Sequence, residues 1–475
     1  MVNVVSALER LTRLAQTPTV SAVAAAFASA DHELALVGGP VRDAFLEKDS
    51  FDLDFTTSAT PDEIIAVLKP IASTYWEIGR EFGTIGGVVK GETVEITTYR
   101  ADRYHESSRK PEVAFGTHIE EDLRRRDFTI NALALRLPEL SLVDSGTGIE
   151  DLMAGILRTP IDAEESFSDD PLRMLRAARF TSQLGFAVSA ETKQAASKLA
   201  PRLAVVSAER IRDEFSKLLL TPNPRAGLEF LVETGLAAEF IPELPGLKLE
   251  SDEHGQHKDV YQHSLTVLEQ AIELEGSRGF EPRPDLVLRL AALLHDIGKP
   301  STRKLESDGR VTFYHHDFVG AKLARKRLKE LRFEKQHIEQ TAELVALHLR
   351  FFGYTEKSWT DSAVRRYVRD AGELLERLHI LTRSDVTSQN ARKVRRLAAA
   401  YDDLERRIAE LEAEEKISAL RPELDGQQIM ALLNLAPGPE VGLAYKFLLE
   451  LRLDEGVLGE EVAGEKLLQW WSSQD

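Results

Sequence analysis

The sequence predicts an α+β domain at the N-terminus, a mixed sheet with helices, followed by an all-α remainder. Strand-like apolar runs and helical periodicity alternate up to about residue 160, whereas after about Phe167 strand signals fade and long helical patterns take over. At 475 residues the chain is also too long for one hydrophobic core. We therefore expect four domains, over residues 20–160, 161–245, 256–390 and 391–475.

The first domain begins with a strand that runs into two glycines. The segment Leu36-Val37-Gly38-Gly39-Pro40-Val41-Arg42-Asp43 predicts a strand, a double glycine and a helix start, where Pro40 needs no N–H partner. Gly38 and Gly39 let a phosphate approach the backbone, and the free N–H groups of the helix can hold it. Arg42 adds a fork of donors for a triphosphate. The segment predicts a nucleotide-binding loop.

The next strand carries two carboxylates. Apolar and acidic residues alternate in Phe51-Asp52-Leu53-Asp54-Phe55, so Asp52 and Asp54 point to the same face of a strand. Neighbouring carboxylates repel each other, and a divalent cation relieves that repulsion. Mg²⁺ suits them because it binds one or two carboxylates together with substrate phosphates. Asp52 and Asp54 are thus the predicted catalytic and Mg²⁺-binding residues of a nucleotidyl transfer site.

Two further segments follow in the same domain. Residues 84–98 predict a β-hairpin with a turn at Lys90-Gly91, and Glu95 in it is either a third carboxylate near the metals or an ordinary strand residue. The segment Arg125-Arg126-Asp127-Phe128-Thr129-Ile130-Asn131-Ala132 offers cations for phosphate, with Asp127 and Asn131 on one helical face. Asp127 or Thr129 can also cap the helix expected to follow.

The helical remainder opens with a pattern that bears on base choice. In Asp169-Asp170-Pro171-Leu172-Arg173-Met174-Leu175-Arg176-Ala177-Ala178-Arg179-Phe180, the spacing places Asp170, Arg173 and Arg176 along one helical face. An acceptor beside a forked donor matches cytosine and adenine, which both present an exocyclic amine next to a ring nitrogen acceptor. Uracil and guanine present a carbonyl beside an N–H. One Asp–Arg pair can therefore accept CTP and ATP without a nucleic-acid template, although an ordinary salt-bridged helix is the alternative.

Taken together, these segments resemble the motifs of class II tRNA nucleotidyltransferases, which are the CCA-adding enzymes and their relatives the bacterial poly(A) polymerases. The resemblance implies a catalytic head over residues 20–160 and a neck over 161–245 that recognises the base. Asp169 stands where the family has Glu, and residues 104–111 look like its flexible loop. The nucleotide-binding residues implied are Gly38, Gly39, Arg42, Arg126, Asp170, Arg173, Arg176 and Arg179.

The third domain is rich in histidine, with nine of the 12 histidines between His254 and His379. The segment Leu293-Leu294-His295-Asp296-Ile297-Gly298-Lys299 resembles the signature of HD-domain metal-dependent phosphohydrolases. The resemblance implies a metal site formed by His263, His295, Asp296 and Asp385, to which His315 or His316 and His348 could add ligands for a second metal. Such ligands favour a divalent transition metal of unknown identity over Mg²⁺. Related domains act as phosphatases, 2′-nucleotidases or 2′,3′-cyclic phosphodiesterases.

The last domain predicts a charged helix followed by a compact helical unit. It looks like the tail of HD-bearing family members, which implies an RNA-binding module that grips tRNA. The net charge of −18 argues against broad coating by nucleic acid, so RNA contact requires local basic faces. The candidates are residues 124–126, 322–335 and 392–396.

Composition limits the remaining choices. The chain has no cysteine, no apolar run long enough for a membrane span and no signal peptide pattern, so we expect a cytoplasmic protein without membrane contact. Nothing implies a protein partner. The favoured function is a CCA-adding enzyme that uses CTP, ATP and two metals on tRNA, with an HD phosphohydrolase activity. A poly(A) polymerase, an enzyme adding only CC or only A, and an HD hydrolase with a regulatory transferase site stay open.

Overall fold

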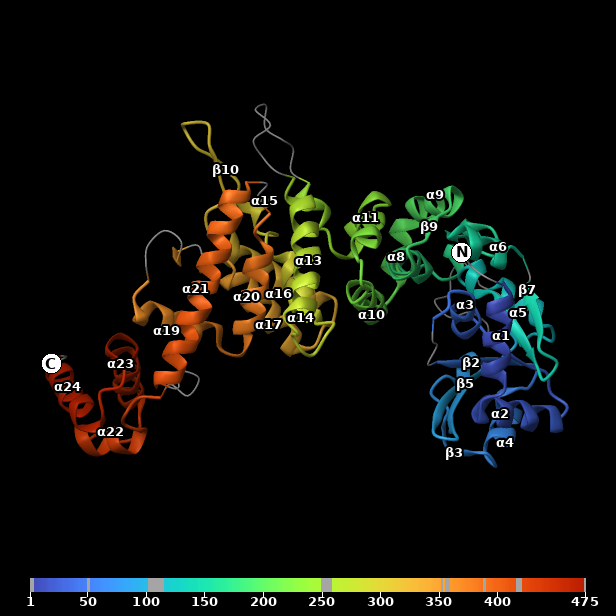
Figure 1. Ribbon diagram of the computed structural model, residues 1–475, viewed down its shortest axis with the longest axis horizontal. Coiled ribbons are helices and arrows are strands. Elements are labelled where there is room, and N and C mark those ends of the chain that lie inside the picture. Colours follow the sequence, from blue (N-terminus) through green and yellow to red (C-terminus); the bar gives the residue numbers. More distant parts are fainter. Residues whose placement is uncertain are drawn as a thin grey trace. The chain divides into compact units, whose positions relative to one another are not determined.

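The computed structural model describes residues 4–48, 52–100, 115–144, 146–248, 259–351, 353–354, 359–387, 390–415 and 421–473 (Figure 1). The chain divides into two compact units, Met1–Pro242 and Glu243–Asp475. Residues 104–111, which resemble the flexible loop, lie outside the described residues. The predicted fold class, a mixed sheet with helices followed by a helical remainder, is confirmed.

A seven-stranded mixed sheet forms the centre of the first unit, in the order β3-β4-β5-β2-β1-β6-β7. Neighbouring strands are antiparallel except β2 and β5, which are parallel. The predicted hairpin over residues 84–98 is confirmed as β4 and β5, and Lys90 and Gly91 turn with positive φ. The strands are β1 Leu34–Val37, β2 Leu53–Thr57, β3 Ala72–Trp76, β4 Thr84–Val89, β5 Glu92–Thr98, β6 Leu133–Leu137 and β7 Ser141–Asp144.

Helices cover the sheet because its central strands are apolar on both faces. All four residues of β1 are buried. On one face, Ile119 and Leu123 of α5 share a core with Ala35 and Val37. The helices of this part are α1 Val4–Ala15, α2 Pro18–Ser29, α3 Gly39–Phe45, α4 Pro61–Leu68, α5 Ile119–Arg124 and α6 Gly148–Ala154.

The segment after α5 differs from the expectation of a helix. Residues Thr129–Asn131 form a single 3₁₀ turn, and β6 follows at Leu133. The side chain of Asp127 accepts a hydrogen bond from the N–H of Phe128 at 2.8 Å. Asp127 therefore does not cap a helix. The next residues form a strand and not a helix because Leu133, Ala134 and Leu135 are buried and pair with β1 and β7.

The rest of the first unit is helical apart from one pair of two-residue strands, β8 Ile156–Leu157 and β9 Ala187–Val188, which run parallel. Sequence periodicity does not reveal strands this short. The helices are α7 Ala163–Asp169, α8 Leu172–Leu184, α9 Ala190–Leu199, α10 Ala208–Leu219, α11 Arg225–Glu233 and α12 Leu236–Phe240.

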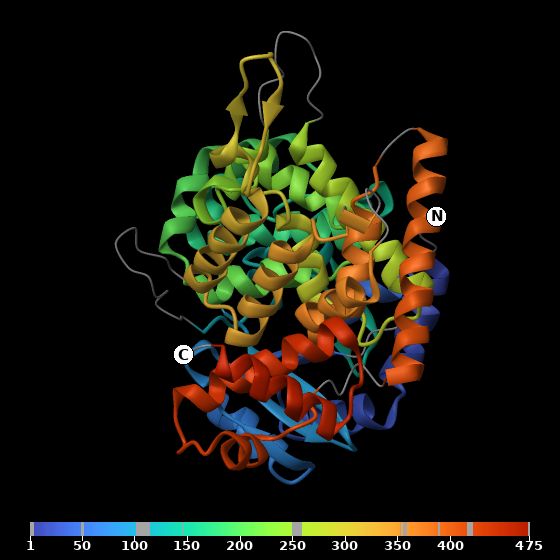
Figure 2. The same ribbon diagram turned by 90° about the vertical axis from the view of Figure 1, so that its left-hand side faces the viewer.

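In its described residues, the second unit is a helical body with one hairpin. The hairpin, β10 Lys304–Leu305 and β11 Val311–Thr312, extends beyond the surrounding helices (Figure 2). The body helices are α13 Val260–Ser277, α14 Leu286–Leu294, α15 Lys299–Thr302, α16 His316–Glu330, α17 Lys335–Leu347, α19 Asp361–Ala371 and α20 Leu375–Ser384.

A long helix and a three-helix cluster end the described chain. The helices are α21 Ala391–Glu415, α22 Gly426–Leu433, α23 Pro439–Glu455 and α24 Glu460–Ser472. The last three share a small core that includes Ile429, Leu448 and Leu467, and Phe447 stacks on Trp470 at 4.4 Å. None of the described helices is both long and apolar enough to cross a membrane.

Candidate functional site

The predicted magnesium-binding carboxylates lie on a central strand of the sheet. Asp54 is in β2, and Asp52 immediately precedes that strand. In the parallel register Asp54 pairs with Glu95 of β5. Residues paired in register point to the same side of a sheet, so Glu95 joins the two aspartates on one face. The sequence left open whether Glu95 belongs to this cluster, and the register places it there.

Crowded negative charge shows in the pKa of Asp54. Burial of the carboxyl raises the pKa of Asp54, and the charges of Glu95 and Asp52 raise it further. Arg126 and Arg42 oppose this rise, and the pKa of Asp54 is about 6. At Asp54, burial and the neighbouring carboxylates therefore outweigh the two guanidinium groups. Carboxylate oxygens in this state are ligands that Mg²⁺ prefers. The residues present fit a hard divalent cation.

We expect Asp54→Asn to stabilise the metal-free protein. The folded chain holds the Asp54 proton with a pKa of about 6, against about 3.9 in an unfolded chain. This carboxyl therefore contributes stability below about pH 4 and loses it as the pH rises through 6. At pH 7.5 the substitution should raise the free energy of unfolding by about 1–2 kcal/mol.

Urea unfolding in EDTA, repeated between pH 7.5 and 4, measures this gain, which should shrink as the pH falls. Asp62→Asn is the control because the Asp62 side chain in α4 is 79% exposed. An Asp54→Asn protein no more stable than wild type at pH 7.5 would show that burial and the neighbouring carboxylates do not raise the pKa of Asp54.

Two arginines and the double glycine lie beside the carboxylates. Gly38 has a φ of +73°, and a Cβ there would come within 3.3 Å of Arg126 Nη1. Arg126 also donates from Nη2 to buried Asp122 at 3.2 Å. Arg42 in α3 is buried and donates from Nη1 to Asn131 Oδ1 at 2.8 Å. A Cβ at Gly39 would likewise lie 4.0 Å from Arg42 Nη2, so each glycine of the loop has a guanidinium group nearby. Guanidinium groups suit the binding of a triphosphate.

A buried polar network extends from Arg42 toward α8. Asn131 donates to Asp127 Oδ1 at 3.0 Å, and Arg176 donates to Asp127 Oδ2 through Nε at 2.7 Å. Burial alone would raise the pKa of Asp127, but Arg176 and Asn131 hold it well below its usual range. Asp127 therefore stays ionised, and its ion pair with Arg176 connects the segment between α5 and β6 to α8.

The arginines of α8 are held on both sides by acceptors. Arg179 donates from Nε to the buried carboxylate of Glu214 in α10 at 2.7 Å, and Arg176 Nη1 lies 3.7 Å from the same carboxylate. The Phe180 ring lies under three guanidinium groups, at 5.4 Å from Arg42 and Arg176 and 4.2 Å from Arg179. Glu214 was not predicted from the sequence, because nothing in its own segment indicates a partner 35 residues away.

Asp170 and Arg173, which the sequence placed together as a base-reading pair, contact different partners. Asp170 precedes α8 and accepts from Arg210 of α10 at 2.8 Å. The Arg173 guanidinium is buried and donates to the Ser166 side chain at 2.8 Å and to the Arg125 carbonyl. In this structure Arg173 holds the loop that carries Arg125, and Asp170 is paired with Arg210 and not with Arg173.

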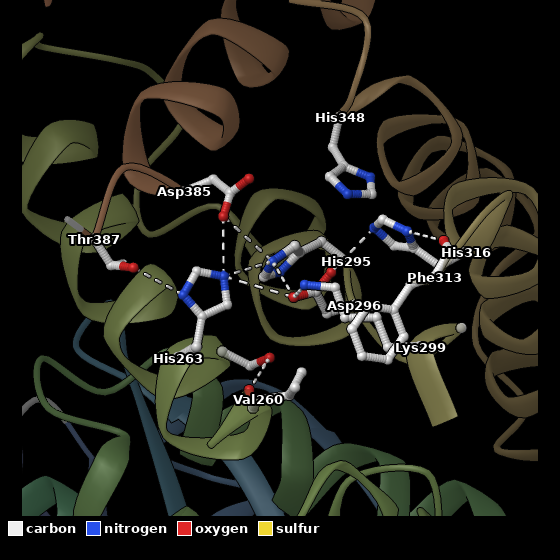
Figure 3. Close-up of polar contacts among 12 residues, drawn as sticks. Val260, His263, His295, Asp296, Lys299, Phe313, His316, His348, Asp385 and Thr387 are labelled. Carbon is white, nitrogen blue, oxygen red and sulfur yellow. Dashed lines mark hydrogen bonds and ion pairs between the residues drawn. The ribbon is translucent and has the colours of Figure 1, made fainter. Parts of the chain in front are cut away.

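The histidines of the second unit form two neighbouring sets of three ligands (Figure 3). Within the described residues, these are the two sets whose ligand atoms all lie within 4.8 Å of one another. One set is His263, His295 and Asp385, and the other is Asp296, His316 and His348. Of His315 and His316, it is His316 that belongs to one of these sets, whereas His315 is exposed at the N-cap position of α16.

Each histidine ring is oriented from behind. The Nδ1 atoms of His295, His316 and His348 contact backbone carbonyl oxygens at 2.6–2.9 Å, and Nδ1 of His263 contacts the Thr387 hydroxyl at 3.0 Å. All four Nε2 atoms are therefore available to the centre, as metal-ligating histidines require.

The carboxylates of the two sets lie close to the histidine rings. Asp385 Oδ1 lies 2.9 Å from His263 Nε2, and Asp296 Oδ1 lies 3.3 Å from His316 Nε2. Burial lowers the pKa of His348 to about 4, so this ring is neutral at pH 7, and its buried Nε2 has no hydrogen-bond partner in the described chain. An orphaned neutral imidazole beside carboxylates fits a divalent transition metal.

The two sets open into a cavity of about 520 Å³. Lys299 lies at its wall, donates to Asp296 Oδ2 at 2.6 Å and packs over the Phe313 ring. Beyond the HD signature, Lys393 and Leu397 of α21 also line it. The cavity is large enough to admit a phosphoester next to the ligands.

We expect Gly298→Ala to damage this centre. A Cβ at Gly298 would lie 2.1 Å from the carbonyl oxygen of His316 and 2.7 Å from the N atom of Gly320. Backbone must move to admit it, so the free energy of unfolding should fall by about 1–3 kcal/mol and bound metal should drop. Calorimetry and metal analysis by mass spectrometry measure both.

Gly276→Ala is the matched control, because Gly276 lies exposed in α13 with open space at its Cβ position. This variant should be as stable as wild type or slightly more so. Equal metal content in both variants would show that α15 and α16 need no close approach at Gly298.

The fold and the two sites define a class of protein: a nucleotidyltransferase head joined to an HD-type helical body. Family models match three segments, namely the Poly A polymerase head domain over residues 34–158, the probable RNA and SrmB-binding site of polymerase A over 185–247, and the HD domain over 260–390.

Named relatives make the assignment narrower. The chain is 36% identical over 365 residues to the A-adding tRNA nucleotidyltransferase of Deinococcus radiodurans, which covers 75% of this chain and 80% of the relative. It is 31% identical over 442 residues to the CC-adding tRNA nucleotidyltransferase of Thermus thermophilus, covering 91% and 93%. The chain therefore belongs to the tRNA nucleotidyltransferase family.

A solved structure agrees over the full length. The chain resembles the crystal structure of Bacillus stearothermophilus CCA-adding enzyme in complex with CTP, with a TM-score of 0.68, 25% identity, and coverage of 97% of this chain and 99% of that one.

Proposed function

We propose that this enzyme adds C, C and A from CTP and ATP to the 3′ end of tRNA without a nucleic-acid template. The carrying observation is the cluster of Asp52, Asp54 and Glu95 beside Arg42 and Arg126, because it joins a divalent-cation site to a triphosphate site. The relatives set the substrate class, since their names specify addition to tRNA. A relative crystallised with CTP supports the nucleotide.

The chain's own residues supply positioning and charge. Asp52 and Asp54 would hold Mg²⁺, which when bound favours ionisation of the RNA 3′-hydroxyl and neutralises the pyrophosphate. Arg42 and Arg126 would bind the triphosphate, and their contacts with Asn131 and Asp122 fix them before it arrives. The 3′-oxygen forms the new bond to the α-phosphorus, and pyrophosphate leaves.

The test uses purified protein, Mg²⁺, each labelled nucleoside triphosphate in turn, and tRNA transcripts ending at the discriminator base, at C or at CC. Addition of two C and one A followed by a stop supports the proposal. Long A-tracts on any RNA indicate a poly(A) polymerase. No incorporation from any triphosphate contradicts the transferase assignment and leaves the HD centre as the main activity.

Partial addition is the second candidate, because two relatives that match most of the chain are named as an A-adding and a CC-adding tRNA nucleotidyltransferase. The same three transcripts separate these outcomes. A CC-adding enzyme extends only the first two, and an A-adding enzyme extends only the transcript ending in CC.

We further propose that the HD centre is a phosphohydrolase that trims RNA ends, with His263, His295, Asp296 and Asp385 among its ligands. A bound transition metal would supply Lewis-acid activation of water. Lys299 would place positive charge beside a phosphate in the cavity. Opening of a 2′,3′-cyclic nucleotide to a nucleotide monoester, or release of phosphate from a 2′-nucleotide, in the presence of Mn²⁺, Ni²⁺ or Zn²⁺ tests this activity.

The domain assignment is part of this proposal: a head over residues 20–160, a base-recognising neck over 161–245, the HD domain over 256–390 and an RNA-binding tail over 391–475. A truncation that ends at residue 390 should retain nucleotide binding and lose affinity for tRNA.

A further inference from the structure

One arginine outside the predicted motif completes the base-recognition end of the transferase site. Asp170 lies between α7 and α8, with its side chain 27% exposed. Its Oδ1 accepts the N–H of Leu172 at 3.1 Å, and its Oδ2 accepts from Arg210 Nη2 at 2.8 Å. Both oxygens of this carboxylate are therefore held, one by the start of α8 and one by α10.

Arg210 projects from a helix that is firmly docked. Residues Ile211 and Phe215 of α10 are buried, and Phe215 meets Phe240 edge-to-face at 5.4 Å. The buried carboxylate of Glu214, one turn after Arg210, accepts from Arg179 of α8 at 2.7 Å. The base of the Arg210 side chain is therefore fixed relative to the helix that Asp170 precedes.

Folding has little use for the Asp170–Arg210 pair. The Arg210 side chain is 53% exposed, and ion pairs this open to water contribute little to stability. Orientation is different, because the terminal torsion of an aspartate is broad. If only Oδ1 were hydrogen-bonded, the carboxylate of Asp170 could rotate about its terminal torsion. The second hydrogen bond, from Arg210 to Oδ2, fixes the direction of the remaining lone pairs.

We propose that Arg210 is a positioning residue that holds Asp170 as an acceptor for the exocyclic amine of an incoming cytosine or adenine. A carboxylate oxygen accepts more than one hydrogen bond, so Oδ2 can take the amine and keep Arg210. A carbonyl of uracil or guanine in the same place meets a fixed lone pair and is repelled. Arg210 thereby sharpens rejection of UTP and GTP, an inference that rests on the proposed transferase function.

The experiment measures binding of CTP, ATP, UTP and GTP to the full chain by equilibrium dialysis with Mg²⁺ and no RNA, so that no turnover enters. Arg210→Ala should lower the ratio of the UTP and CTP dissociation constants about fivefold, as the loss of one well-oriented hydrogen bond predicts. Arg210→Lys should restore most of the ratio. Urea midpoints should be unchanged in both variants.

The matched control is Arg212→Ala, because Arg212 lies on the same helix and pairs with its neighbour Asp213 at 2.7 Å. Its ratio should equal that of wild type. The inference is overturned if Arg210→Ala keeps the wild-type ratio, or if it weakens all four nucleotides equally, which would indicate a general charge effect. Wild-type protein that binds no triphosphate would instead overturn the proposed transferase function itself.

Discussion

The Asp52→Asn, Asp54→Asn double variant is expected to lose nucleotide transfer by about 10³-fold or more while it keeps any hydrolase activity of the second unit. Two carboxylates of the cluster would become neutral, and divalent cations bound there supply several kcal/mol of transition-state stabilisation. Incorporation of labelled CTP into a tRNA transcript at saturating Mg²⁺ measures the loss.

The control for this pair is again Asp62→Asn, an exposed carboxylate of the same domain. Two results are expected together. The metal-free Asp54→Asn protein is more stable than wild type, and the double variant with Mg²⁺ has less nucleotide transfer activity than wild type. Such opposition is expected where function requires like charges to be crowded together. Transfer within tenfold of wild type in the double variant would mean that Asp52 and Asp54 are not the metal-binding residues.

His316→Ala is expected to remove one metal equivalent from the HD centre and to abolish phosphohydrolysis without effect on nucleotide transfer. His316 supplies one of the three ligands in the set with Asp296 and His348. Losing one ligand of three should weaken metal affinity at least as much as the tenfold to 100-fold that losing an outer partner costs. Metal content after dialysis and hydrolysis of a 2′,3′-cyclic nucleotide to its ring-opened monoester measure the change.

The adjacent histidine provides a close control. His315 is exposed and has a φ of +63°, a conformation that asparagine tolerates, so His315→Asn preserves the backbone. This variant should keep full metal content. If both variants lose metal alike, the effect comes from disturbing the start of α16 and not from a lost ligand.

Local patterns in the sequence predicted local structure well. Alternation in Phe51-Asp52-Leu53-Asp54-Phe55 predicted a strand, and the Lys90-Gly91 turn predicted the hairpin, because each depends on residues close together in the chain. The helix expected after Asp127 was wrong, since pairing with β1 and β7 determines the conformation of those residues. Tertiary pairing of this kind leaves no mark on helical spacing.

Contacts between residues that are distant in the sequence could not be predicted from it. Arg210 and Glu214 lie 35 or more residues from the groups they contact, and α10 reads as an ordinary amphipathic helix. Glu95 joined the carboxylates only through the parallel register of β2 and β5. In the HD body, the sequence suggested His315 or His316 together with His348 as extra ligands, whereas the carbonyl oxygens and the Thr387 hydroxyl that contact the Nδ1 atoms became visible only in the fold.

The buried network from Arg42 through Asn131 and Asp127 to Arg176 bears on how this enzyme can evolve. Asp127 is buried, whereas the Arg176 side chain is 33% exposed. Loss of Arg176 would therefore leave a buried carboxylate without its cation, which destabilises the fold, so we expect few substitutions at this pair. Substitutions along the network should be strongly epistatic, because neighbours in one polar chain do not act additively. Variation in nucleotide choice among relatives is therefore expected to accumulate at exposed supports outside the network, of which Arg210 is one.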